Sequence, residues 1–103
     1  MERFQTITPV DGSVYVERPY ANSAQINVTL DKAQTAQKHW QSLPLEARQA
    51  ICQKAVACFV ANQDAIAEEV SWMMGRPIAY TKGEVAGFEE RATHMIKIAP
   101  EAL

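Results

Sequence analysis

Two cysteines, Cys52 and Cys58, are the side chains of this 103-residue chain with the greatest capacity for nucleophilic chemistry. A catalytic cysteine needs a lowered pKa and a neighbouring oxyanion hole. Both cysteines instead lie among apolar and small residues in a segment with helical periodicity. Their spacing separates them by about 240° around a helix, so they cannot pair with each other. We therefore expect both cysteines to pack in the core.

The other residues with catalytic or ligand chemistry are scattered. His39 and His94 are far apart, and neither has a second metal ligand at the usual spacing. The segment 75–87 contains neither a Gly-x-Gly-x-x-Gly nor a Walker pattern. Adjacent glutamates point to different sides of a helix and are expected in solvent rather than as carboxylate dyads. This applies to Glu68-Glu69 and Glu89-Glu90. We predict no catalytic, cofactor-binding or metal-binding residue in the chain.

Length and composition limit the class of protein. A chain of 103 residues with 48% apolar residues allows one domain at most. The net charge is −2 and Lys and Arg form no run, so neither nucleic acid nor an anionic membrane is expected as a partner. No apolar run approaches the roughly 20 residues that span a bilayer. The first residues lack the apolar core of a signal peptide, and two cysteines fit a reduced compartment. These features predict a cytoplasmic protein.

The first 22 residues are expected to form a β-hairpin region. Residues that favour strands flank the dipeptide Asp11-Gly12. Glycine accepts the positive φ that hairpin turns require. Because a lone two-stranded hairpin is marginally stable in water, it must pack against another part of the chain.

Helical periodicity begins at residue 29 and predicts a helical region over 29–99. Thr29 is the predicted N-cap of a first helix that ends near Trp40. A second helix, over 44–61, starts with Pro44 at its first position, where the missing N–H costs nothing. Its wide apolar stripe predicts burial on more than one side.

Two further helices complete the prediction. The third starts after a cap at Asn62 and ends at Gly75, which tolerates the left-handed conformation. The fourth starts at Pro77 and extends to about Ala99. The predicted core residues are Ile66, Val70, Met73 and Met74 in the third helix and Val85, Phe88, Ala92, Met95, Ile96 and Ala99 in the fourth. The fold class is mainly α, with about four helices and an N-terminal β-hairpin.

Two local features suggest contacts beyond the helix pattern. Trp72 is expected to cover the hairpin, with Met73 and Met74 in the core, and the alternative is a soft apolar contact surface. Gly83 and Gly87 lie one helical turn apart, and each lowers helix propensity by about 1 kcal/mol relative to alanine. Such a pair is expected where another backbone approaches closely.

The order of these segments resembles the N-terminal part of the aldehyde dehydrogenase superfamily. The family opens with an Asn-Pro-x-Thr-Gly-Glu hairpin, followed by a helix with Trp, a Pro-x-x-x-Arg helix start and a Gly-x-Pro junction before Gly-Glu-Val. The matching segments here are Thr6–Ser13, Ala36–Trp40 with Pro44–Arg48, Phe59–Ala67, Gly75–Pro77 and Gly83–Val85. The likeness covers nearly the whole chain and keeps the family's relative spacing. It implies the front part of an α/β, Rossmann-type enzyme.

The resemblance also implies a chemistry that the family performs elsewhere in its sequence. The family oxidises aldehydes to acids and transfers a hydride to NAD or NADP, using a nucleophilic Cys, a Glu base and an Asn side chain in the oxyanion hole. These motifs lie downstream in the family, and neither cysteine here has its Gly-Gln-x-Cys context. Some members bind a monovalent cation near Glu84 with carbonyls near Thr6 and Ile7. The alternative for Glu84 is a helix-start carboxylate facing the helix dipole.

Two functions stay open at this point. The first is the N-terminal portion of an NAD(P)-dependent aldehyde dehydrogenase, with residues 1–103 as a single partial domain that is not catalytically competent alone and holds no cofactor itself. The second is a stand-alone helical interaction or regulatory module derived from that segment. Helices shaped to cover a larger sheet expose apolar stripes when that sheet is missing. The expected partner is therefore the remainder of the enzyme or another copy of the chain.

Overall fold

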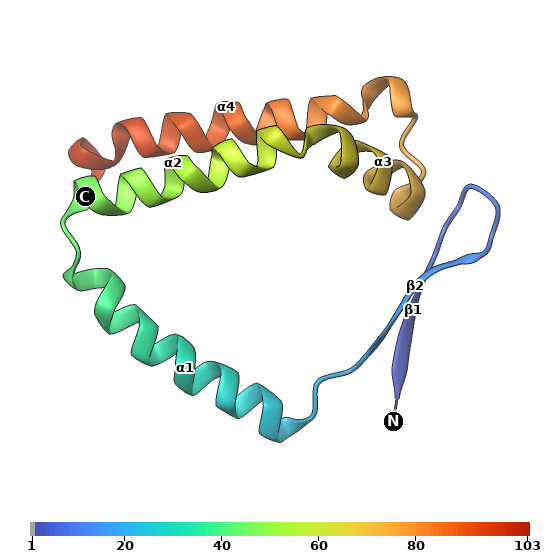
Figure 1. Ribbon diagram of the computed structural model, residues 1–103, viewed down its shortest axis with the longest axis horizontal. Coiled ribbons are helices and arrows are strands. Elements are labelled where there is room, and N and C mark those ends of the chain that lie inside the picture. The colour runs from blue at the N-terminus through green and yellow to red at the C-terminus, as the bar shows by residue number, and fades with distance from the viewer. Residues whose placement is uncertain (1) are drawn as a thin grey trace.

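The computed structural model describes residues 2–103 and contains a two-stranded hairpin followed by four helices (Figure 1). The elements are β1 (Arg3–Ile7), β2 (Val14–Pro19), α1 (Ser23–Ser42), α2 (Leu45–Ala61), α3 (Gln63–Met74) and α4 (Ile78–Ala102). The predicted mainly α class, with an N-terminal hairpin and four helices, is confirmed. The helical region covers 23–102 rather than 29–99.

The hairpin turn is held by an aspartate beside a left-handed glycine. Asp11 Oδ1 accepts hydrogen bonds from Ser13 N at 2.9 Å and from Ser13 Oγ at 2.6 Å. These bonds, the hydroxyl first, lower the pKa of the Asp11 carboxyl below its ordinary value of 3.8. Gly12 has a φ of 78°, as the Asp-Gly pattern predicts. Thr8 closes the loop, because its N–H donates to the Ser13 carbonyl at 2.9 Å.

A bulge near the turn aims Tyr15 out of the hairpin. The antiparallel register pairs Thr6 with Val16 but Ile7 with Val14, so it skips Tyr15. Bulges commonly redirect a side chain in this way. The Tyr15 ring stacks on Trp72 of α3, with centroids 6.5 Å apart and planes 6° apart. The prediction that Trp72 covers the hairpin is confirmed.

The start of α1 differs from the sequence prediction. Asn22, not Thr29, is the N-cap: its Oδ1 accepts from Gln25 N at 2.8 Å, and Gln25 Oε1 accepts from Asn22 N at 2.9 Å. This reciprocal capping box satisfies two backbone donors that a helix start leaves free. Thr29 lies inside the helix, where its hydroxyl donates to the Gln25 carbonyl. The expected cap at Thr29 was wrong because a helix start is set by side chains that satisfy its free N–H groups, and Asn22, seven residues before Thr29, does so together with Gln25.

The junctions between the later helices follow the predicted residues with small shifts. Pro44 and Pro77 are N-caps rather than first helical residues, so α2 and α4 begin one residue later. Asn62 separates α2 from α3, but its side chain donates to the Cys58 carbonyl at 2.8 Å and so caps the end of α2. Gly75 has a φ of 77° and closes α3, as predicted.

The helix α4 continues through a proline. Pro100 has no N–H, so the carbonyl of Ile96 lacks its usual helical donor. Gln49 of α2 supplies one instead, with Nε2 2.8 Å from the Ile96 oxygen. The helix therefore extends to Ala102, three residues beyond the predicted end.

The arrangement is an open arch in which α2, α3 and α4 pack together while α1 extends away from them (Figure 1). The radius of gyration is 17.9 Å, whereas a compact domain of about 100 residues has about 13 Å. The described residues have a small core: Thr8, Ala67, Thr81 and Val85. No residue of α1, over 23–42, is buried. No helix among residues 2–103 has the length and apolar character to cross a membrane.

Several predicted core residues are exposed in this arch. Val85 is buried as predicted, and Ile66, Val70, Ala92, Ile96 and Ala99 are half-buried. Met73, Met74, Phe88, Met95 and Cys58 are exposed, so the core assignment was wrong for them. Cys52 is half-buried. The periodicity identified the apolar faces correctly, but within residues 2–103 nothing covers much of their area.

Candidate functional site

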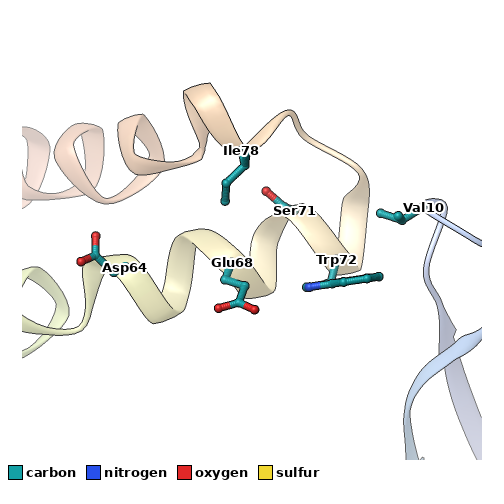
Figure 2. Close-up of a pocket in the computed structure, with 6 residues that line it drawn as sticks. All are labelled: Val10, Asp64, Glu68, Ser71, Trp72 and Ile78. Carbon is teal, nitrogen blue, oxygen red and sulfur yellow. The ribbon is translucent and has the colours of Figure 1, made fainter.

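A depression lies where the hairpin turn meets α3 and the start of α4 (Figure 2). It has a volume of about 470 Å³ and is open to solvent. Its lining residues are Val10, Asp64, Glu68, Ser71, Trp72 and Ile78. We call it the hairpin groove.

Helix spacing explains the floor of the hairpin groove. Asp64, Glu68 and Ser71 recur at intervals of four and three residues, which places them on neighbouring turns of α3. Val10 comes from the hairpin turn, and Ile78 from the first turn of α4. The groove therefore combines two carboxylates, one hydroxyl and apolar walls.

The charges of the hairpin groove are solvated. Asp64 Oδ1 lies 3.0 Å from Lys82 Nζ, with both side chains more than two-thirds exposed. Exposed pairs of this kind contribute at most about 1 kcal/mol. Glu68 points away from Ile78 (Figure 2). The two carboxylates thus stay apart, and the expected solvent role of Glu68 agrees with its exposure.

Ser71 is the polar group of the groove that is not solvated. Its hydroxyl oxygen is buried and has no hydrogen-bond partner among residues 2–103. In Figure 2 it points toward Ile78 rather than toward a base. Asp64 pairs with Lys82 and Glu68 points away, so neither carboxylate of the groove is directed at the hydroxyl as a base, and the hydroxyl can only accept or donate a hydrogen bond.

The second place of interest is the junction between α3 and α4, because sequence reasoning singled out Glu84. The carboxylate of Glu84 pairs with the guanidinium of Arg76. Glu84 is the seventh residue of α4 rather than part of its first turn, so its role as a helix-start carboxylate was wrong. The cation alternative has no support from this geometry, since an arginine already occupies the carboxylate.

The cysteines and histidines are not brought together. Among residues 2–103 no three His, Cys, Asp or Glu side chains are close enough to hold a metal ion. Cys52 and Cys58 stay unpaired thiols on different sides of α2. The hydroxyl of Ser71 was missed at the sequence level. Its spacing from Asp64 and Glu68 could have predicted that the three side chains share one side of a helix. The contact with Val10 could not have been predicted in this way, because it depends on long-range packing.

Comparison with known proteins identifies the family. A model described as the aldehyde dehydrogenase family matches residues 1–102. The chain belongs to the aldehyde dehydrogenase family. It is 30% identical over 83 residues to a succinate-semialdehyde dehydrogenase [NADP(+)] of Deinococcus radiodurans, which covers 81% of this chain. It is 29% identical over 84 residues to a probable succinate-semialdehyde dehydrogenase [NADP(+)] of Sinorhizobium fredii, covering 82% of the chain.

A third aldehyde dehydrogenase shows the same partial overlap. A long-chain-aldehyde dehydrogenase of an Acinetobacter species is 30% identical over 78 residues, or 76% of this chain. The matched segments make up 17%, 17% and 16% of the three relatives. The chain therefore spans about one-sixth of the length of the aldehyde dehydrogenases it matches, and the suspected resemblance to their N-terminal segment is confirmed.

Proposed function

We propose that this chain supplies the N-terminal covering segment of an NAD(P)-dependent aldehyde dehydrogenase and is not catalytically competent alone. The reaction of the complete enzyme is oxidation of an aldehyde to an acid, with hydride transfer to NAD or NADP. The observation that carries the proposal is the family match over residues 1–102. The cofactor is held by the remainder of the enzyme, and the segment contributes a framework.

The exposed apolar faces of the arch support this role. Leu30 on α1, Met74 on α3 and Met95 on α4 are 61%, 66% and 62% exposed. A soluble monomer rarely leaves so many large apolar side chains uncovered. The remainder of the enzyme is the proposed cover, in a cytoplasmic protein without nucleic acid or membrane partners.

Split-enzyme rescue tests the proposal. The Deinococcus radiodurans relative would be expressed without its matched N-terminal segment, together with either residues 1–103 of this protein or its own segment as the positive control. NADP⁺ reduction with succinate semialdehyde is expected from both pairs and from neither part alone. Rescue by the relative's own segment but not by this chain would overturn the proposal. Turnover by the purified 103-residue chain alone would contradict the proposal that the chain is inactive by itself.

The rival function, a stand-alone interaction module, predicts a different result. Such a module would bury its stripes in copies of itself. Its thermal midpoint would then rise with protein concentration, while co-expression with the truncated relative would give no activity.

A further inference from the structure

A second depression, lined mainly by apolar side chains, lies between the end of α1, the start of α2 and the end of α4. It has a volume of about 270 Å³ and is open to solvent. Its lining residues include Trp40, Leu45, Arg48, Cys52, Met95 and Ile96. We call it the α2–α4 groove. Because Trp40 belongs to α1, an occupant of the groove would bridge α1 to the rest of the arch.

Among the described residues that line the α2–α4 groove, Arg48 alone has a charged side chain. Its Nε is buried and has no hydrogen-bond partner among residues 2–103. Arg48 also takes part in none of the ion pairs formed by the described residues. Arginine stays protonated in proteins, so a guanidinium N–H removed from water without an acceptor is costly to the fold. Buried donors of this kind are normally satisfied by a partner.

The chemistry of the groove defines that partner. Apolar walls favour an apolar surface, and a guanidinium with a free Nε favours a carboxylate, which can accept two parallel N–H bonds side on. The occupant must therefore present an acidic side chain framed by apolar ones. The length of the relatives supplies a source, because the chain corresponds to about one-sixth of each of them.

We propose that the α2–α4 groove receives an apolar segment from the remainder of the enzyme, and that an Asp or Glu of this segment accepts hydrogen bonds from Arg48. The proposal rests on the proposed function and names the surface through which the covering segment is held. It assigns Arg48 a positioning role and not a catalytic one. The same occupant covers Met95 and draws α1 toward α2 through Trp40.

The test uses the split enzyme with two matched substitutions on α2. Arg48→Met removes the guanidinium and keeps an apolar stem, whereas Lys54→Met removes the same charge from an exposed position on the same helix. The truncated Deinococcus radiodurans relative is the probe, and binding is measured by titration with the labelled chain. Arg48→Met is expected to raise Kd roughly 30-fold or more. Lys54→Met is expected to change it by less than about twofold.

The possible results distinguish failure of the docking inference from failure of the proposed function. Wild-type binding with an equal Kd for Arg48→Met would overturn the docking inference and leave the proposed function standing. No rescue by the wild-type chain, when the relative's own segment rescues, would overturn the proposed function and this inference with it. If circular dichroism shows that Arg48→Met does not fold, Arg48→Lys replaces it. Lysine keeps the charge but has no side-on pair of donors, so it too is expected to weaken binding, and wild-type affinity would overturn the inference.

Discussion

Gln49 of α2 donates its side-chain N–H to the carbonyl of Ile96, the carbonyl that Pro100 leaves without a helical donor. The contact joins two residues 47 positions apart in the sequence. It replaces a missing local bond with a long-range one and fixes the end of α4 against the start of α2. The same two helix ends form the α2–α4 groove.

The contact between Gln49 and Ile96 predicts a coupling between Gln49 and Pro100. Gln49→Leu should lower the free energy of unfolding by about 1–2 kcal/mol, because a partly buried carbonyl loses its partner. In a Pro100→Ala background the helix supplies its own N–H, so the same substitution should cost about 1 kcal/mol less. Urea unfolding of the four variants measures the coupling. Additive effects would contradict this explanation of how α4 passes through Pro100.

Substitutions of two glycines should change stability in opposite directions. Gly75→Ala places a side chain on a residue with φ 77° and a Cβ 2.8 Å from Pro9 Cγ. We expect a loss of about 1–3 kcal/mol. Gly87 lies inside α4, where a Cβ would meet no atom of the described residues within 4 Å. Gly87→Ala should therefore gain about 0.5–1 kcal/mol in the isolated chain. Thermal unfolding followed by circular dichroism gives both values, and a stabilising Gly75→Ala would refute the hairpin contact.

The first helix provides a test of its cap. Asn22→Ala removes the acceptor for Gln25 N and should destabilise α1 by about 1 kcal/mol. Thr29→Ala removes only a hydroxyl that donates to a carbonyl within the helix, and alanine has the higher helix propensity. Amide hydrogen exchange over residues 23–42 should therefore accelerate for Asn22→Ala and not for Thr29→Ala. The reverse order would restore Thr29 as the cap.

The hairpin turn should depend on acid pH through Asp11. Its pKa is lowered in the folded chain, so the folded state favours the carboxylate. The contribution of Asp11 to stability is therefore complete above its unfolded pKa, and is lost as the pH falls through the lower folded pKa. An NMR titration of the Asp11 carboxyl should give a pKa below 3.8. Ser13→Ala should move it back toward that value, and an unchanged pKa in the variant would contradict the role of the hydroxyl.

The sequence predicted the residues at which the chain turns better than it predicted burial. Asp11-Gly12, Asn62 and Gly75 act through local chemistry, and all three lie at turns or helix ends in the structure. The N-cap at Asn22 was missed because apolar periodicity does not report a cap, which here is the polar pair of Asn22 and Gln25. Periodicity also marked Met74 and Met95 as core, although it can only identify a face and not what covers it.

The two grooves also differ in how far they could be predicted from the sequence. The common side of Asp64, Glu68 and Ser71 on α3 follows from spacing alone. The free Nε of Arg48 does not, because it depends on how α1, α2 and α4 meet. Sequence reasoning placed Pro44–Arg48 in the family pattern, but only packing shows that this arginine lacks an acceptor among residues 2–103.

The packing of neighbouring elements in the arch affects when each part of the chain folds during synthesis. The packed pairs β1 with β2, α2 with α3 and α3 with α4 join consecutive elements, and α2 with α4 joins helices separated by one other helix. Chains dominated by such local contacts fold in microseconds to milliseconds, whereas ribosomes add about 5–20 residues each second. In a polypeptide that continues past residue 103, the hairpin and α2–α4 would thus take shape while later residues are still being translated. The exposed apolar faces would then serve as a template on which the nascent remainder folds.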